Sequence, residues 1–590
     1  MNNRFTRMKN IKITPLPEHA SDLPVDLHDI GKCQLTGLIY QRWRADGNEY
    51  GIFTYIAEGM HYNRPCIIIA PPSGENVSDF LLRYGLIQFA RKSQVFLCLL
   101  EPPVDDWTMD GKAADFMNAA YKKVLARDYY VAMQDNIYSF GFDDGASVAQ
   151  QAVMKMASEW SGLATFGNLS SHVMQTADGT SDKDAGTQSG ETQILAKRCQ
   201  VPVWMYLDDT TGTAAQVIQF WKKENHSFDE PLFDCCGTEI YLPVPVQSTS
   251  KLNDEHIAQV RISRKDWKEH LSCQELDKVW AYIGSARRHR GYDGKFLRYY
   301  REPLKNGAQH HTMFVDGIQR EWYEYVPQRV RESDKAVPLV VVLHGRGGDA
   351  ESFFDITDMS IVAEERGFIA LFPTADFYQA REDGLRSVRV WDGNYQGQGI
   401  DSCIFLRQMI EDAKSRLPVD GGRIYACGQS SGGKMASCCA MAMSDIFTAA
   451  APWSGVSCPN SSSDLFGYPY QTAFSAGNVP IFLTVGENDG FFDAVGFDPI
   501  SHKNGLLHDY LRFLRSAFHL AETPLCYQCP PISYWVWRNQ KGTPMLKLGI
   551  VRNMAHANYA EQSRIAYDEF FAQFSRAADG TLLYMGQSAE

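Results

Sequence analysis

Residues 428–432 read Gly-Gln-Ser-Ser-Gly, which places Ser430 between two glycines. An apolar run over 423–427 precedes this stretch and a helix-compatible run over 433–443 follows it, so the pattern predicts a strand, a tight turn and a helix. Such a turn exposes the serine hydroxyl to a base that can remove its proton. The glycines leave room for neighbouring backbone, and the first helical amides, starting at Ser431, point toward the oxyanion of a tetrahedral intermediate. The stretch predicts an acyl-transfer nucleophile, although an ordinary Gly/Ser turn can have the same five residues.

A second glycine-rich turn, His-Gly-Arg-Gly-Gly, covers residues 344–348. The run before it, 337–343, is apolar and β-branched on both faces, which predicts a strand in the middle of a parallel sheet. The backbone N–H of Arg346 is predicted to join that of Ser431 in an oxyanion hole. A phosphate loop is the alternative, but neither G-K-[ST] nor G-x-G-x-x-G is present. We therefore predict no cofactor and no metal.

An acidic loop follows a later apolar run. Residues 481–485 predict a strand that leads into Gly-Glu-Asn-Asp-Gly over 486–490. A carboxylate in this loop would orient an imidazole and stabilise its charged form. We predict Asp489 in that role, with Glu487 and Asp493 as the alternatives.

A histidine, His556, follows the last strand predicted in the C-terminal part of the chain, residues 545–551. The order serine, acid, histidine, each after a later strand of one sheet, is the order that a nucleophile-elbow triad requires. In this interpretation Ser430 attacks an ester carbonyl, His556 takes and returns the proton, and Asp489 orients the imidazole.

The second half resembles the family of polyhydroxybutyrate depolymerases and related feruloyl and acetylxylan esterases, which are α/β-hydrolases. The residues that carry the resemblance lie between Arg320 and Gly455: 323–327, 343–345, Gly367-Phe368, Phe372-Pro373, Val419-Asp420, 423–425 and 428–433. The resemblance implies a serine carboxylesterase that hydrolyses a feruloyl, acetyl or hydroxyalkanoate ester through an acyl-enzyme. A serine peptidase of the same fold, an acyltransferase and a non-catalytic binding protein are the alternatives.

The chain departs from the family at two positions. Many relatives have a cysteine after the His-Gly pair and another before a tryptophan, whereas this chain has Arg346 and Val390 there. Together with the lack of a recognisable signal peptide, this departure favours a small, internalised ester over an extracellular polymer as the substrate.

Two tryptophans, Trp391 and Trp453, lie on loops expected above the carboxyl edge of the sheet, where α/β folds bind ligands. We predict that they bind substrate by stacking on an aromatic acyl group or a sugar. Packing within a lid or the core is the alternative.

The first half repeats the strand, elbow and helix pattern in a diverged form. The turn is Phe-Gly-Phe-Asp-Asp-Gly over 140–145, and runs near 162–168 and 201–207 match the later strands of the second half. We therefore predict an α/β protein with tandem α/β-hydrolase domains: a degenerate copy in residues 1–292, here called the first half, and a catalytic copy in residues 293–590, the second half.

An aspartate, Asp143, occupies the nucleophile position of the first half. Aspartate can be a nucleophile, but it would still need a histidine after the last predicted strand, 258–262, and none is in place. His270 lies nearby in a segment that is predicted to be helical and solvated. We expect the first half to be a structural, oligomerising or substrate-presenting domain.

The composition is that of a soluble globular protein, with 44% hydrophobic and 22% charged residues and a formal net charge of −13. The negative charge and the absence of a basic stripe predict that nucleic acid is not a partner. No apolar window reaches the length of a membrane span, and the 14 cysteines lack the spacing of a disulfide framework. We predict a cytoplasmic enzyme with a small-molecule or oligomeric ester substrate, no membrane partner, and a homo-oligomer formed through the first half.

One basic cluster stands apart from this chemistry. Residues 287–294 read Arg-Arg-His-Arg-Gly-Tyr-Asp-Gly at the end of the first half. They are predicted to be a solvated helix end and linker rather than an anion site.

Overall fold

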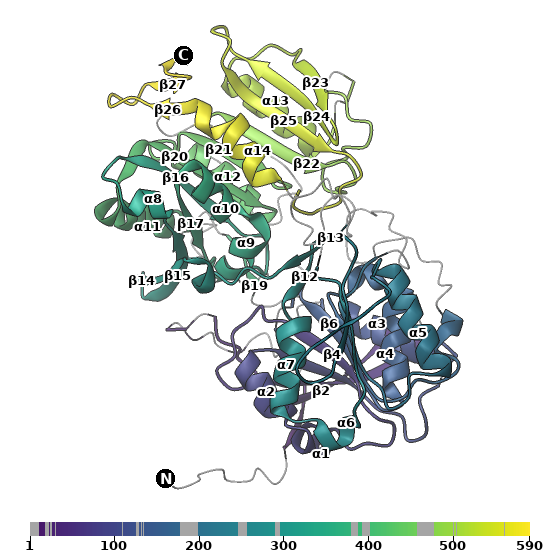
Figure 1. The fold of residues 1–590 in the computed structure, drawn as a ribbon. Helices are drawn as coiled ribbons and strands as arrows, with labels where there is room; N and C mark the ends of the chain where they lie inside the picture. The colour runs from purple at the N-terminus through teal and green to yellow at the C-terminus, as the bar shows by residue number, and fades with distance from the viewer. Residues whose placement is uncertain are drawn as a thin grey trace.

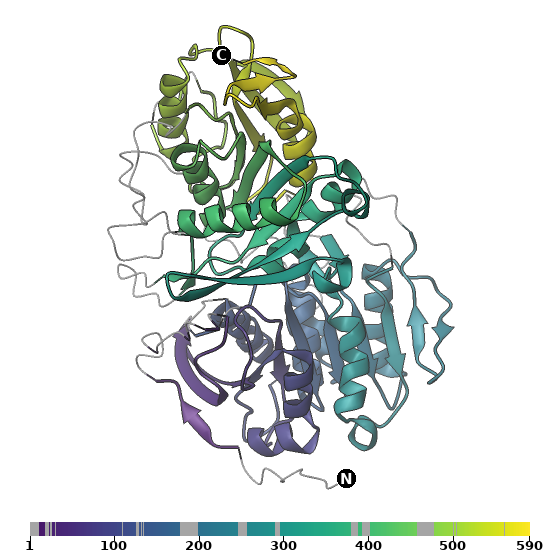
Figure 2. The same cartoon turned by 90° about the vertical axis from the view of Figure 1, so that its left-hand side faces the viewer.

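The structure is a computed structural model with two large mixed α/β units, one in each half of the chain (Figures 1 and 2). The described residues are 11–17, 23, 26, 28–29, 31–45, 47–108, 110–125, 129–130, 132–133, 135–176, 199–245, 256–289, 296–378, 388–391, 402–456, 477–499, 501–502, 504–559 and 561–589. The predicted α/β class is confirmed. The predicted boundary at 292/293 lies outside the described residues.

The sheet of the second half has the order β14-β15-β17-β16-β20-β21-β22-β25-β24-β23. Its strands are β14 (Gln309–Val315), β15 (Ile318–Tyr325), β16 (Val337–Leu343), β17 (Ile369–Pro373), β20 (Val419–Gln429), β21 (Ala449–Trp453), β22 (Ile481–Gly486), β23 (Leu525–Cys529), β24 (Ile532–Arg538) and β25 (Pro544–Val551). The run from β17 to β25 is parallel, and the flanking strands on each side are antiparallel. Loops after the parallel strands therefore meet at one edge of the sheet.

The sheet of the first half has the order β1-β2-β3-β5-β4-β6-β7-β8-β11-β10-β9. Its strands are β1 (Ile13–Pro15), β2 (Gly37–Ala45), β3 (Asn48–Ile56), β4 (Cys66–Ala70), β5 (Phe96–Leu100), β6 (Ile137–Phe142), β7 (Leu163–Phe166), β8 (Val203–Tyr206), β9 (Leu232–Phe233), β10 (Glu239–Tyr241) and β11 (Val260–Ser263). From β2 onward, the order and directions match those of the second sheet position by position.

Helices connect the strands of both sheets (Figure 1). They are α1 (Val77–Arg83), α2 (Leu86–Ser93), α3 (Lys112–Val124), α4 (Gly145–Lys155), α5 (Gly212–Glu224), α6 (Trp267–His270), α7 (Cys273–Ile283), α8 (Gln328–Arg331), α9 (Ala350–Thr357), α10 (Met359–Arg366), α11 (Ser402–Arg416), α12 (Ser431–Ala442), α13 (Leu506–Ala517) and α14 (Gln562–Glu569). Within the described ranges, no helix is both long enough and apolar enough to cross a bilayer.

Short strands lie outside the two large sheets. They are β12 (Ala286–His289) with β13 (Phe296–Tyr299), β18 (Phe377–Tyr378) with β19 (Val388–Arg389), and β26 (Phe574–Arg576) with β27 (Leu582–Tyr584) and β28 (Gln587–Ser588). In Figure 1, β12 and β13 lie where the two α/β units meet.

The prediction of a solvated helix end and linker was wrong for residues 287–289, which form part of β12, and the remainder of the cluster lies outside the described residues. Arg287 and Arg288 lie in β12 and are buried. The guanidinium of Arg288 donates to the backbone carbonyls of Trp160 at 2.9 Å and Gln200 at 2.7 Å. A buried arginine is stable when carbonyls accept its N–H groups, and a charge count along the sequence cannot show those acceptors.

Candidate active site

The strand-to-helix turn at Ser430 has the strained geometry of a nucleophile elbow. Ser430 follows β20, directly precedes α12, and has φ 57° and ψ −115°. A residue with a side chain rarely adopts a positive φ unless the surrounding structure imposes it, so the strain is a signal of function. The Ser430 N–H donates to the Trp453 carbonyl at 2.9 Å, which ties the turn to the next strand.

Three glycines make this turn possible. A Cβ atom added at Gly428 or Gly432 would lie 2.4 Å or 2.0 Å, respectively, from the carbonyl oxygen of Leu343. One added at Gly455 would lie 2.0 Å from the carbonyl oxygen of Ser430. These separations are far below van der Waals contact, so the glycines are required by close backbone approach, as the sequence predicted for Gly428 and Gly432.

An acid and a base meet beside the same edge of the sheet. Nδ1 of His556 lies 2.8 Å from Oδ2 of Asp489. Asp489 is buried, and its other oxygen accepts the Phe491 N–H at 3.2 Å, whereas the His556 side chain is 20% exposed. Because Nδ1 faces the carboxylate, Nε2 is left to take a proton from a nucleophile. The structure therefore brings together the predicted acid and base.

The two other predicted acids have different surroundings. Glu487 accepts the backbone N–H of Asn553 at 3.0 Å and so ties the acid loop to the loop that carries His556. The backbone N–H of Asn488 donates to the Met554 carbonyl at 2.9 Å and adds a second tie. Asp493 is exposed and has φ 48°. The geometry therefore favours Asp489 as the partner of His556.

The loop 344–348 packs against the elbow. A Cβ atom added at Gly345 would lie 2.5 Å from Oε1 of Gln429 and 3.6 Å from Cβ of Ser430. Arg346, the next residue, thus has its backbone close to the predicted nucleophile. At the elbow, Ser431 is the first residue of α12, and the amides of a first helical turn have no partner within the helix. The two segments that carry the predicted oxyanion donors are therefore adjacent to Ser430, and their role in binding an oxyanion stays a prediction.

His344 fixes this loop as a neutral side chain. Its Nε2 accepts the Ala375 N–H at 2.8 Å, so Nδ1 carries the proton and donates to the Gly345 carbonyl at 2.7 Å. The ring is fully buried, and burial lowers the pKa of His344 to about 3 despite the hydrogen bond to Gly345.

The burial of His344 predicts a pH-dependent stability. In the unfolded chain an ordinary histidine binds a proton near pH 6.5, whereas folded His344 stays neutral down to pH of about 3. The unfolded state therefore gains protons as the pH falls, and the free energy of unfolding decreases. Between pH 6.5 and 4.5 we expect the wild type to lose about 2 kcal/mol more than His344→Gln, measured by urea unfolding. Parallel pH profiles of the two proteins would contradict this prediction.

Trp391 and Trp453 are both only 1% exposed. The Trp391 indole N–H donates to the His344 carbonyl at 2.8 Å, and its backbone N–H donates to Oγ of Ser431 at 3.1 Å. Trp391 thus connects the loop 344–348 to the elbow. Binding of substrate by either tryptophan stays a prediction.

The corresponding elbow of the first half shares the positive φ and the tie to the next strand but has other side chains. Asp143 has φ 54°, and its N–H donates to the Phe166 carbonyl at 2.8 Å, as Ser430 does to Trp453. Its carboxylate accepts from Nζ of Lys268 at 2.6 Å. His270 is exposed in α6, and its Nδ1 lies 2.8 Å from the Asp266 carbonyl. In the first half a lysine, not a histidine, therefore meets the elbow side chain.

The carboxylate of Asp144 binds the loop amide of the first half. Its Oδ1 accepts the Ser73 N–H at 3.0 Å, and its Oδ2 accepts the Trp107 N–H at 3.3 Å. The Trp107 indole donates to the Pro71 carbonyl at 2.7 Å, which repeats the contacts of Trp391 in the second half. Asp144 occupies the position in this turn that Ser431 occupies in the second half, and its carboxylate accepts the backbone N–H of Ser73 in the preceding loop.

Sequence reasoning missed Phe491 at this site. Its ring is 55% exposed and lies edge-on to the His556 ring, with centroids 5.0 Å apart. Val495, 64% exposed, follows four residues later. A phenylalanine two residues after the predicted acid was the available signal.

Comparisons with known proteins match the part of the chain that carries the Ser430 turn. Residues 324–468 match the family model described as esterase PHB depolymerase. Over 154 residues the chain is 32% identical to feruloyl esterase B of Thermothelomyces thermophilus, which covers 26% of this chain and 50% of that protein. Over 141 residues it is 27% identical to poly(3-hydroxyalkanoate) depolymerase C of Paucimonas lemoignei, which covers 23% and 31%. A solved acetyl xylan esterase from Aspergillus awamori aligns at 17% identity over 45% of this chain and 99% of that chain, with a TM-score of 0.35.

The chain spans half or less of the length of these two curated relatives. The segment that matches the family model includes Arg346, Ser430 and Ser431 but ends before Asp489. The resemblance to the polyhydroxybutyrate depolymerase and feruloyl esterase family is therefore confirmed, and it lies in the part of the chain that carries the elbow.

Proposed function

We propose that the protein is a serine carboxylesterase whose second half hydrolyses a small or aromatic-acyl ester. The observation that carries the proposal is the strained Ser430 turn, at the same sheet edge as the His556–Asp489 pair. Similarity of residues 324–468 to carboxylic ester hydrolases supports the same chemistry.

In the proposed mechanism Oγ of Ser430 bonds to the ester carbonyl carbon while Nε2 of His556 takes the hydroxyl proton. The amides of Arg346 and Ser431 stabilise the oxyanion, each by about 3–4 kcal/mol. The C–O bond then breaks, and the alcohol leaves with the proton held by His556. Water, deprotonated by His556, releases the acid and restores Ser430.

Apolar groups beside the base support a feruloyl-type or other apolar acyl group. Phe491 presents an exposed ring next to His556, and Val495 extends the apolar surface. An aromatic acyl group could stack on Phe491, whereas an acetyl group would leave it in water.

We further propose that the first half is a degenerate copy without catalytic activity. Lys268 forms an ion pair with Asp143, and the Asp144 carboxylate accepts the backbone N–H of Ser73. A developing oxyanion at that position would meet a negative charge instead of free N–H donors. The cytoplasmic location and association through the first half stay predictions.

Labelling with a fluorophosphonate, a reagent that phosphonylates activated serines, tests the proposal. We expect one adduct per chain on the peptide that contains Ser430, and loss of p-nitrophenyl ester turnover in proportion to labelling. Before inhibition, rapid mixing should show a burst of about one p-nitrophenol per chain if deacylation is the slow step. An unlabelled protein that turns over no ester would favour a binding protein, and turnover of p-nitroanilides over esters would favour a peptidase.

A further inference from the structure

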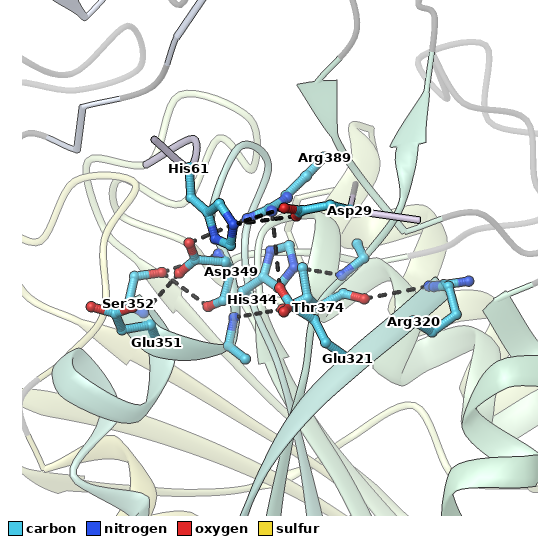
Figure 3. A network of polar contacts seen from close by, with 12 residues as sticks. Asp29, His61, Arg320, Glu321, His344, Asp349, Glu351, Ser352, Thr374 and Arg389 are labelled. Carbon is cyan, nitrogen blue, oxygen red and sulfur yellow. Dashed lines mark hydrogen bonds and ion pairs between the residues drawn. The ribbon is translucent and has the colours of Figure 1, made fainter. Parts of the chain in front are cut away.

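The loop 344–348 and the start of α9 are connected to residues of the first half (Figure 3). Asp349 is the N-cap of α9: its Oδ1 accepts the Ser352 N–H at 2.9 Å, and the helix begins at the next residue. The helix therefore continues directly from the predicted oxyanion loop. A displacement of its first turn would be transmitted to Arg346, only three residues before the N-cap.

Arg389 is the central residue of these contacts. Its Nη1 donates to Oδ2 of Asp349 at 3.2 Å, and its Nη2 lies 4.0 Å from Oε1 of Glu321. Its backbone carbonyl accepts the Gly347 N–H at 2.8 Å. The side chain is 3% exposed, so water screens these interactions weakly. Arg389 thus holds both the loop and the N-cap that follows it.

The first half contacts Arg389 from the other side. A Cβ atom added at Gly31 would lie 2.9 Å from Nη2 of Arg389 and 3.2 Å from Nδ1 of His61. Nε2 of His61 in turn pairs with Asp29 at 3.2 Å, and Figure 3 shows Asp29 and His61 beside the guanidinium. Gly31 leaves the space that the Arg389 side chain needs.

A second contact reaches α9 itself. Nη1 of Arg64 donates to Oε2 of Glu351 at 2.7 Å, and both side chains are at most 25% exposed. The hydroxyl of Tyr300 donates to the other oxygen of Glu351. Arg64 and Glu351 are 287 residues apart in sequence, so the pair joins the two halves.

We infer that the first half is a positioning module for the ester-hydrolysing site: through Arg64 and the Gly31–His61 surface it holds Arg389 and the start of α9, and so sets the oxyanion loop. The inference rests on the proposed function, because it gives the loop a task only if an oxyanion forms at Ser430. A positioning role would explain why the first half keeps the fold although its Asp144 carboxylate accepts the N–H of Ser73, the residue that corresponds to Arg346.

The physical basis is preorganisation. Oxyanion donors lower the barrier only if they already lie at hydrogen-bonding distance from the position that the oxygen will occupy, and a misplacement of about 1 Å can cost about 100-fold in rate. His344 holds the start of the loop, whereas the two glycines after Arg346 leave its end dependent on the hydrogen bond from Gly347 to the Arg389 carbonyl. Arg64 and Arg389 are positioning residues because neither is expected to touch substrate.

The test compares Arg64→Ala with the matched control Arg83→Ala. Arg83 is in the same half, at the end of α1, where its side chain is 52% exposed and pairs with Glu75 at 3.0 Å. We expect Arg64→Ala to lower kcat about tenfold with KM changed less than twofold, and to weaken a trifluoromethyl ketone, which forms an oxyanion at Ser430, by the same factor. Arg64→Lys should restore most of the loss, and Arg83→Ala should behave as wild type.

Hydrogen exchange of the backbone amides over 344–358 gives a readout that is independent of activity. We expect faster exchange there in Arg64→Ala and in Gly31→Val, whose side chain would displace the guanidinium of Arg389. Unchanged exchange, or faster exchange with unchanged kcat, would overturn the inference. Lack of ester turnover in the wild type would instead refute the proposed function, and the exchange data would still decide whether the first half holds the loop.

Discussion

Ser430→Ala should lower kcat for a p-nitrophenyl ester by on the order of 10⁴- to 10⁶-fold and leave the fold unchanged. Alanine removes only the hydroxyl oxygen, so the acyl-enzyme cannot form. The remaining oxyanion donors and His556 can still assist attack by water at a low rate. The measurement is steady-state hydrolysis, with thermal unfolding to show that the variant is folded.

The chain supplies its own matched control for this variant. Asp143 lies at the same point of the corresponding turn in the first half, with φ 54° against 57° for Ser430. We expect Asp143→Ala to keep ester turnover within about twofold of the wild type, because Asp143 pairs with Lys268 and Asp144 accepts the Ser73 N–H. Turnover that survives Ser430→Ala and is lost in Asp143→Ala would assign the chemistry to the first half and overturn the proposal.

The turns at Ser430 and Asp143 share several backbone features. Both turns keep the backbone strain, the tie to the next strand and the tryptophan that connects loop and turn. They differ in the side chains that perform chemistry. The shared positive φ therefore does not by itself separate the two turns, and the Asp143→Ala and Ser430→Ala measurements decide which of them performs the chemistry.

Much of this fold could be predicted because local patterns decide it. The strand 337–343 was predicted with its observed bounds, since it is buried on both faces. The helix-compatible stretch near 79–92 forms two helices, α1 and α2, because Gly85 at φ 70° interrupts it. The hairpin β23–β24 was not predicted. Its edge strand β23 is exposed and includes Cys526 and Cys529. Whether a strand extends the sheet depends on its partner, which a local pattern does not contain.

The candidate site, too, could be predicted from the sequence only in part. Ser430, Asp489 and His556 follow strands in a fixed order, so the sequence contains their positions even though they are far apart. The roles of Arg389 and Arg64 were not predicted. Their contacts join residues of different halves, and isolated arginines carry no periodic signal. Contacts between two folded units depend on how their surfaces meet.

Asp489→Asn should lower kcat about 10⁴-fold with little change in KM. The carboxylate accepts from Nδ1 of His556 and so keeps Nε2 free of a proton and ready to act as a base. An asparagine amide can donate to Nδ1 and would favour the tautomer with the proton on Nε2, which cannot deprotonate Ser430. The measurement is the pre-steady-state rate of p-nitrophenol release, since acylation is the step that needs the base.

Two variants decide between Asp489 and the other predicted acids. Glu487→Gln keeps an acceptor for the Asn553 N–H, so we expect kcat within a few-fold of the wild type. Asp493→Asn alters only an exposed side chain and should have no effect. Glu487→Gln could instead lose as much activity as Asp489→Asn. The Glu487 carboxylate, which accepts the Asn553 N–H, would then be needed as well, and the contact between Asp489 and His556 would not explain the activity alone.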